Sequence, residues 1–152
     1  TLEGTRPILV EIQALATPTN FGYPKRTTSG FDLNRLNLLV AVIERRTKLK
    51  LNDKDIYINV VGGLKIRDSA ADLAVCLAIA SAIAGRKLAE DFVVFGEVGL
   101  GGEIRSAFRP DQRISEAKKL GFAHAIAPVT VHDEFVIPVR DLRTTLIEYV
   151  NE

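Results

Sequence analysis

The fold is decided at one strand–loop–helix segment, Val60-Val61-Gly62-Gly63-Leu64-Lys65-Ile66-Arg67-Asp68-Ser69-Ala70-Ala71-Asp72-Leu73-Ala74-Val75-Cys76. The run that leads into it, Asp55 to Val61, is rich in β-branched and aromatic residues and predicts a strand. The two glycines that follow permit a sharp turn of the backbone. Asp68 or Ser69 can cap the next helix, and we expect Ser69 to act as the N-cap. Ala70 to Ala84 is almost wholly apolar and small, so this helix should be buried on most sides.

The residues upstream of this segment predict a strand, a loop and a helix. Arg6 to Thr17 alternates in part between apolar and polar residues, which is typical of a strand. Pro18 to Gly30 is dense in Pro, Gly, Thr, Ser and Asn and predicts a long loop. Phe31 to Lys50 carries apolar residues at helical spacing and predicts a helix, which Asp32 can cap.

The residues downstream predict shorter elements of both kinds. Gly85 is a candidate C-cap of the apolar helix. We expect strands or hairpin strands at residues 92–97, 103–107, 123–127 and 134–139, and helices at residues 110–120 and 141–150. The closing helix should turn Leu142, Leu146 and Ile147 inward. The order of elements predicts an α+β (mixed α/β) fold, in which a mixed sheet is packed with helices.

Composition is that of an ordinary folded domain. The chain has 152 residues, of which 47% are apolar and 26% are charged, and its net charge is +1. The longest apolar run, Ala70 to Ala84, is too short to span a bilayer and contains Asp72. A lone cysteine, Cys76, within an apolar helix indicates a core residue and a reducing compartment, so we expect a cytoplasmic location. Because the chain starts at Thr1 without a methionine, we expect a fragment of a longer protein.

The central segment resembles the part of Lon-type proteases in which a glycine loop runs into a helix that carries a Pro-Ser-Ala-Gly motif. In register, that motif becomes Ser69-Ala70-Ala71-Asp72 here. Over nearly its whole length the chain is more similar still to the C-terminal Lon-like domain of the RadA (Sms) family of bacterial recombination proteins. The matching motifs are Leu2-Glu3-Gly4-Thr5-Arg6-Pro7, Asp32-Leu33-Asn34-Arg35-Leu36, Ala70-Ala71-Asp72-Leu73-Ala74-Val75 and Val94-Phe95-Gly96-Glu97-Val98-Gly99-Leu100.

This resemblance implies both a fold and a biological setting. The fold would be that of the Lon proteolytic domain, shared with certain ribosomal-protein domains, formed by residues 1–152 as a single unit. The family's Lon-like domain is associated with hexameric ring assembly and DNA contact. In the family the zinc finger and the RecA-like ATPase domain lie upstream, so ATP, magnesium and zinc would belong to those domains and no cofactor to this one. DNA of either strandedness and a recombinase are the partners that the resemblance implies, and branch migration is the activity of the whole protein.

The resemblance also implies that the peptidase dyad is missing. The nucleophile position falls on Ala70, and the two lysine positions of the Lon pattern fall on Asp111 and Arg113. An arginine stays protonated at neutral pH and cannot take a proton from a serine. An alternative remains a Ser/Lys peptidase that uses Ser69 or Ser106 with Lys65 or Lys118. A second alternative is an oligomerisation scaffold that never contacts nucleic acid.

Basic residues on loops are the candidates for contact with DNA phosphates. Each one taken alone is most simply a solvated surface charge. Three loop-rich groups in one fold are more suggestive together, because the loops at strand ends often lie on one side. Arg26 precedes a Thr-Thr-Ser-Gly run and should reach outward. The candidate residues are Lys25, Arg26, Arg35, Lys65, Arg67, Arg105 and Arg109.

The remaining motifs predict no metal or nucleotide site. His124, His132 and the single cysteine, which is remote in the sequence, do not form a zinc-binding spacing. We therefore interpret both histidines as surface or core residues. The glycine-rich run Gly99 to Gly102 lacks the Gly-Lys-Ser/Thr ending of a P-loop and predicts a tight hairpin turn.

Overall fold

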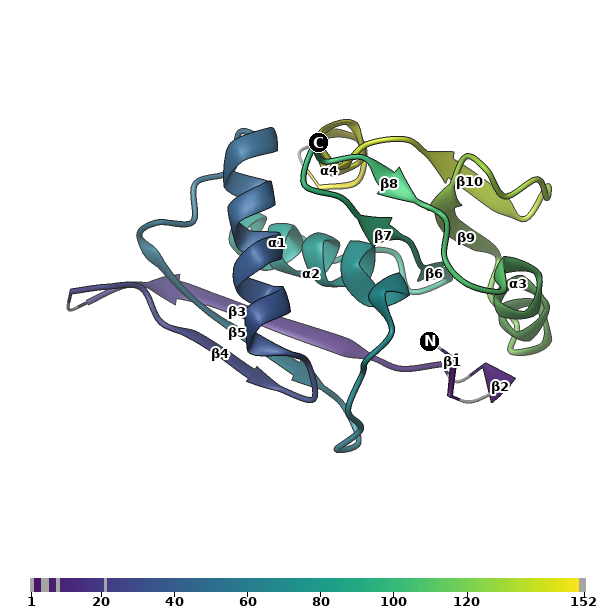
Figure 1. The fold of residues 1–152 in the computed structure, drawn as a ribbon, viewed down its shortest axis with the longest axis horizontal. Helices are drawn as coiled ribbons and strands as arrows, with labels where there is room; N and C mark the ends of the chain where they lie inside the picture. The colour runs from purple at the N-terminus through teal and green to yellow at the C-terminus, as the bar shows by residue number, and fades with distance from the viewer. Residues whose placement is uncertain (1, 4–5, 8, 21, 151–152) are drawn as a thin grey trace.

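A computed structural model of the chain describes residues 2–3, 6–7, 9–20 and 22–150 (Figure 1). Gly4 and Thr5 of the N-terminal motif, and Ile8 of the first expected strand, lie outside the described residues. A short pair of strands, β1 (Leu2–Glu3) and β2 (Arg6–Pro7), runs antiparallel at the N-terminus.

The N-terminal half is a three-stranded sheet with two helices on one face (Figure 1). Strands β3 (Ile12–Pro18) and β4 (Arg26–Ser29) flank β5 (Lys54–Val60), antiparallel and parallel to it respectively. Along β5, Ile56, Ile58 and Val60 are buried while the residues between them are exposed, as the two-residue period of a strand requires. The helices that cover the buried face are α1 (Leu33–Arg46) and α2 (Asp72–Ala84).

The C-terminal half is a parallel three-stranded sheet with a hairpin beside it. Its strand order is β10-β9-β6, and the sheet is followed in the chain by the closing helix. The main hydrophobic core joins α1, α2 and β5 to the closing helix, and a smaller cluster lies between α3 and the second sheet. The elements of this half are β6 (Phe92–Val94), β7 (Glu97–Val98), β8 (Ile104–Arg105), α3 (Pro110–Lys119), β9 (His124–Pro128), β10 (Val136–Val139) and α4 (Leu142–Tyr149).

The expected α+β class and most of the expected elements are confirmed. Asp32 caps α1, because its carboxylate accepts a hydrogen bond from the backbone N–H of Arg35. Gly85 ends α2 in the left-handed conformation, with φ 67°. Pro110 occupies the first turn of α3, where its missing N–H costs nothing. Cys76 is buried in the core, and burial raises the pKa of its thiol.

The expected loop at residues 18–30 was wrong in its second half, which contains β4. Thr27 and Thr28 are β-branched and suit an edge strand, and the backbone N–H of Ile56 donates to the carbonyl of Lys25 at 2.9 Å. The turn residues that precede the strand hid this short run from a pattern-based prediction. The helix predicted over residues 31–50 also ends earlier, at Arg46.

The strand predicted at residues 92–97 is divided at Gly96. The N–H of Gly96 donates to the carbonyl of Ala70 at 2.9 Å, and its own carbonyl accepts from the N–H of Leu73 at 3.1 Å. Here the chain leaves β6 and joins the start of α2 before it forms the hairpin of β7 and β8. A side chain at Gly96 would meet Ile104 Cγ2 at 2.9 Å, so this close approach needs a glycine.

The expectation for Ile147 was also wrong, since this side chain is 48% exposed. The residues of α4 that face the core are Leu142, Thr145 and Leu146, at the i, i+3, i+4 spacing of one helical face. Ile147 follows Leu146 directly and is therefore rotated by about 100° toward solvent.

Candidate nucleic-acid interface

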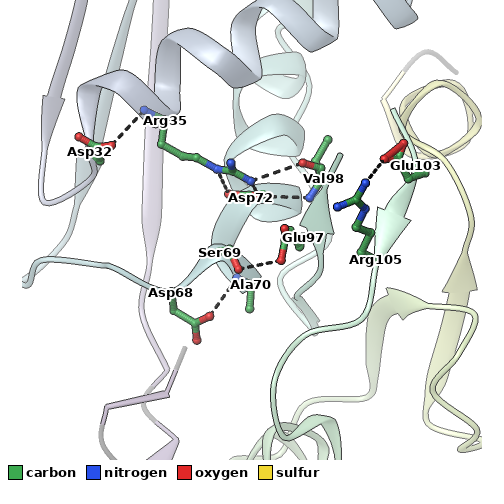
Figure 2. Close-up of polar contacts among 10 residues, drawn as sticks. All are labelled: Asp32, Arg35, Asp68, Ser69, Ala70, Asp72, Glu97, Val98, Glu103 and Arg105. Carbon is green, nitrogen blue, oxygen red and sulfur yellow. Dashed lines mark hydrogen bonds and ion pairs between the residues drawn. The ribbon is translucent and has the colours of Figure 1, made fainter. Parts of the chain in front are cut away.

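The candidate site surrounds the start of α2, where a 3₁₀ turn, η1 (Ser69–Ala71), precedes the helix (Figure 2). Asp68 is the cap of this turn, because its carboxylate accepts from the N–H of Ala70 at 3.0 Å. The expectation that Ser69 is the N-cap was wrong. Its hydroxyl instead donates to the Glu97 carboxylate on β7 at 3.0 Å. A carboxylate one residue earlier has the better position for the free N–H groups, which leaves the serine side chain directed across to the hairpin (Figure 2).

A partly buried ion pair anchors α1 to the first turn of α2 (Figure 2). Arg35 Nε donates to Asp72 Oδ1 at 3.0 Å, and Arg35 Nη2 donates to Asp72 Oδ2. The backbone N–H of Val98 donates to the same Oδ2 at 3.1 Å. Burial raises the pKa of Asp72, and the hydrogen bond with Asp72 raises the pKa of Arg35. Arg35 was expected among the DNA contacts, but its half-buried guanidinium is engaged by the fully buried carboxylate of Asp72.

In the sequence, Asp72 stands out only as an interruption of an apolar run. An ionisable residue within a helix that is apolar on every side signals a buried charge that needs a partner. That signal was present in Ala70 to Ala84, but nothing in the sequence pointed to Arg35 as the partner, because 37 positions separate the two residues.

The second arginine at this site, Arg113, joins α3 to the loop before η1. Its Nη2 donates to Asp68 Oδ2 at 2.6 Å, and its Nε donates to the carbonyl of Phe108 at 2.8 Å. The side chain is 3% exposed, and its Nη1 has no hydrogen-bond partner within the described part of the chain. Arg113 is the residue that the Lon pattern aligns with a lysine position, and here it is an internal ion-pair partner.

Three of the four residues of the alternative Ser/Lys dyads, Ser69, Ser106 and Lys118, have other partners. Ser69 bonds to Glu97, and the Ser106 hydroxyl shares a hydrogen bond with Thr130. Lys118 Nζ lies 3.2 Å from Asp133 Oδ2 and above the ring of Phe135. Within the described part of the chain, neither serine hydrogen-bonds to a lysine.

Four exposed or half-exposed cations lie around the start of α2 and are named here the basic end: Lys65, Arg67, Arg105 and Arg109. Lys65 and Arg67 are exposed on the loop between β5 and η1. Arg105 is exposed on β8 and forms a surface ion pair of 2.8 Å with Glu103. Arg109 has φ 53°, the only positive φ at a non-glycine residue in the described ranges, and its guanidinium stacks 5.0 Å from the ring centre of Phe108.

Two contacts bring these segments together. The Asp68–Arg113 ion pair joins the loop that carries Arg67 to the first turns of α3, where Arg109 is the N-cap. The Ser69–Glu97 hydrogen bond joins the same loop to the hairpin, in which Glu97 is the cross-strand partner of Arg105. Two of the three basic groups expected from the sequence are therefore neighbours in the fold.

The remaining group, Lys25 and Arg26, lies at the other end of β5. Arg26 pairs with Ile56 near the start of β5, whereas Lys65 follows its end. About four residues of extended chain, roughly 13 Å, separate Arg26 from Gly30, whose carbonyl accepts from the N–H of Ile66 beside Lys65, so this group lies apart from the basic end. Arg26 does not reach outward, since its guanidinium donates to the carbonyls of Lys54 and, at 2.9 Å, Leu51.

Asp55 fixes the loop around Lys25, which gives a testable pH effect. Its Oδ1 accepts from the backbone N–H of Lys25 at 2.8 Å and from the Thr19 hydroxyl at 3.0 Å, and the first of these bonds does most to lower the pKa of Asp55. A carboxyl whose pKa is lower in the folded state stabilises the fold at pH values above its unfolded pKa, which is near 3.8. This contribution is lost as the pH falls through the folded pKa.

We therefore expect Asp55→Asn to be less stable than the wild type at neutral pH. The deficit should shrink below about pH 4, as measured by urea unfolding, and a deficit that is constant with pH would contradict this.

The glycine-rich turn and the histidines agree with their structural interpretations. Glu103 turns back over the run Gly99 to Gly102, and hydrogen bonds from its own N–H and from Arg105 lower its pKa. His124 packs edge-on against Phe92, with ring centres 5.6 Å apart. In the ranges that the structure describes, there is no group of three or more His, Cys, Asp or Glu side chains that could hold a metal ion. Nor does any described helix have the length and apolar character needed to cross a bilayer.

Comparisons with known proteins place this chain among two sets of relatives. The family model described as subunit ChlI of Mg-chelatase matches residues 35–131. DNA repair protein RadA of Aquifex aeolicus (strain VF5) is 46% identical over 132 residues, which cover 87% of this chain and 30% of that protein. The protein of the same name from Halalkalibacterium halodurans is 48% identical over 84% of this chain and 28% of its own length. The one from Escherichia coli (strain K12) is 51% identical over 83% of this chain and 27% of its own length. The chain thus spans less than a third of the curated relatives that it matches.

Proposed function

The chain belongs to the family described as subunit ChlI of Mg-chelatase, and we propose that it is the DNA-contacting module of a RadA-type protein. The proposal rests on its similarity, over most of its length, to DNA repair proteins named RadA. In this proposal the module acts in DNA repair and recombination, has no catalytic centre of its own, and contributes to ring assembly. ATP-driven steps and recombinase contacts would belong to the longer protein.

The observation that carries the proposal is the basic end. The segments that present Lys65, Arg67, Arg105 and Arg109 are tied together by the Asp68–Arg113 and Ser69–Glu97 contacts, so their charges act on one region of the surface. The net charge of the chain is only +1, and attraction of a polyanion therefore depends on such local segregation. Backbone phosphates would be the main targets, which gives binding that depends on salt and not on base sequence.

Phe108 and Arg109 add a second kind of contact to this surface. Phe108 is 67% exposed, and the guanidinium of Arg109 covers one side of its ring. A flat, exposed pair of this kind can stack on an unpaired base. The backbone of Arg109 is left-handed and holds the pair at the start of α3. This backbone conformation costs energy for any residue except glycine.

The DNA proposal predicts the effect of reversing charge at the basic end. Lys65→Glu, Arg67→Glu and Arg109→Glu together should abolish most DNA binding by the chain. They should also reduce the slope of log K against log salt by about 3, roughly one for each phosphate that the variant no longer neutralises. Fluorescence anisotropy with labelled single-stranded and duplex DNA over a range of salt concentrations would measure both effects.

A matched variant separates position from net charge. Lys48→Glu, Lys87→Glu and Arg143→Glu reverse the same number of charges at exposed positions away from the basic end. Because overall charge changes equally in both variants, this second variant should keep most of the salt slope. Equal losses in the two variants would remove the assignment. Unchanged binding by the first variant would leave the scaffold alternative as the better explanation.

We further propose that the chain has no peptidase activity, since Ala70 occupies the nucleophile position and Arg113 is engaged in an ion pair. Incubation with unfolded casein should yield no cleavage, and a fluorophosphonate should label neither Ser69 nor Ser106. Labelling of either serine that disappears in the corresponding alanine variant would overturn this proposal.

A further inference from the structure

A groove with a volume of about 620 Å³ is lined by residues of α2 and α3. Its floor is β6 with the adjoining Phe95, and residues 9–12, which lead into β3, form one end. This volume falls within the range of about 300–1,000 Å³ that is typical of ligand-binding sites. The groove is not part of the basic end and has no role in the DNA proposal.

Small side chains keep the groove open. Ala74 and Ala78 on α2 and Ala70 on η1, which leads directly into it, are spaced four residues apart and all line the groove, and Ala117 lines it from α3. Side chains at this spacing lie along one face of a helix. Because each of them ends at Cβ, the two helices leave a channel that larger residues would fill. The exposed walls are therefore apolar, and apolar surface of this shape favours an apolar occupant.

A buried donor forms part of the wall. Arg113 lines the groove, its side chain is 3% exposed, and no described residue forms a hydrogen bond with its Nη1. Native proteins pair nearly all such groups, and each exception needs an explanation. The charge of this guanidinium is already balanced by Asp68 at 2.6 Å. A neutral acceptor such as a peptide carbonyl would thus satisfy Nη1 without adding an unbalanced charge.

The rim of the groove is acidic. Glu11, Glu90 and Glu116 line it, and Arg113 is the only basic residue among the described lining residues. Three carboxylates against one neutralised arginine repel an anionic ligand and attract a cationic one.

We propose that this groove binds a short apolar polypeptide segment, flanked by lysine or arginine, from a partner protein. The apolar side chains of the segment would pack against the alanines of α2 and the floor at β6. One of its backbone carbonyls would accept the hydrogen bond from Arg113 Nη1, and its basic flanks would meet Glu90 and Glu116. The shape of the groove, the unpaired donor Arg113 Nη1 and the negative charge of the glutamates thus favour the same ligand. This ligand is not DNA.

Two labelled probe peptides test this proposal on the protein as it stands. Both have the same apolar centre of leucine, valine and phenylalanine with capped ends, and they differ only in lysine or glutamate flanks. By fluorescence anisotropy, the lysine-flanked peptide should bind about tenfold or more tightly than the glutamate-flanked one. Ala74→Phe should fill the groove and weaken binding at least about tenfold. Ala41→Phe, at an exposed position of α1, is the matched control and should leave the affinity unchanged.

A surface variant keeps the test decisive if Ala74→Phe fails to fold. Glu90→Lys with Glu116→Lys leaves the groove floor intact and should invert the preference between the two peptides. Equal affinity for both peptides, no measurable binding of the lysine-flanked one, or an unchanged preference in this charge-reversal variant would overturn the proposal. Displacement of the bound peptide by dodecanoate at lower concentrations than by unlabelled peptide would also overturn it, because a fatty acid would then be the better ligand.

Discussion

Replacing Arg35 by methionine should destabilise the protein by about 2–4 kcal/mol, somewhat below the range of about 3–5 kcal/mol for a fully buried ion pair, because Arg35 itself is 29% exposed. Asp72 is fully buried, and Arg35 supplies two of the three hydrogen bonds that hold its carboxylate. Methionine retains most of the side-chain volume, so the loss would reflect the unpaired charge and not a cavity. Urea unfolding followed by circular dichroism would measure the change.

Two further variants identify the cause of that loss. Arg45→Met removes an exposed arginine from the last turn of the same helix and should cost well under about 1 kcal/mol. Arg35→Met combined with Asp72→Leu removes both charges and should recover much of the stability, since apolar replacements of buried pairs are often tolerated. A double variant as unstable as Arg35→Met alone would show that the charge of Asp72 is not the cause.

The same pair has a predictable pH dependence. Burial raises the pKa of Asp72 above its ordinary value of 3.8, so the folded protein binds a proton there more readily than the unfolded chain. Stability linked to Asp72 therefore falls as the pH rises from that value through the folded pKa. Arg35 opposes the shift, and without it the pKa of Asp72 should rise further. The deficit of Arg35→Met should accordingly be smaller near pH 4 than near pH 7.

Substitution of Gly30 by alanine should cost about 2–5 kcal/mol, from left-handed backbone strain and a steric clash together. Gly30 has φ 85°, and a Cβ there would lie 2.3 Å from the backbone carbonyl oxygen of Leu64. Its own carbonyl accepts from the N–H of Ile66 at 2.7 Å. Gly30 thus holds the loop that presents Lys65 and Arg67, and DNA binding should weaken along with stability.

Gly22 provides the matched control for the clash. It also has a left-handed φ, 64°, but a Cβ there would have open space around it. Gly22→Ala should therefore show only the conformational part, about 1–2 kcal/mol. Thermal unfolding of the two variants in parallel would separate the terms, and equal destabilisation would mean that the approach of Gly30 to Leu64 is not strained in solution.

Local chemistry made much of the fold predictable. The strand at Asp55 to Val61, the helices that begin after Asp32 and at Pro110, and the stop at Gly85 each follow from signals within a few residues. Propensity, capping and periodicity act over that range and depend on neighbouring residues in the sequence. The strand β4 and the break at Gly96 were missed, because both depend on hydrogen bonds to backbone groups remote in the chain.

The candidate site divides in the same way. Composition and loop position were enough to nominate the seven cations, but they could not say which of them are engaged inside the fold. Arg35 is bound by Asp72, 37 positions away, and Arg26 by backbone carbonyls of Leu51 and Lys54. A charged side chain takes whatever acceptor the packing of helices and strands brings within about 3 Å. Only that packing separates the arginines that hold the fold together from Lys65, Arg67, Arg105 and Arg109, which face the solvent at the basic end.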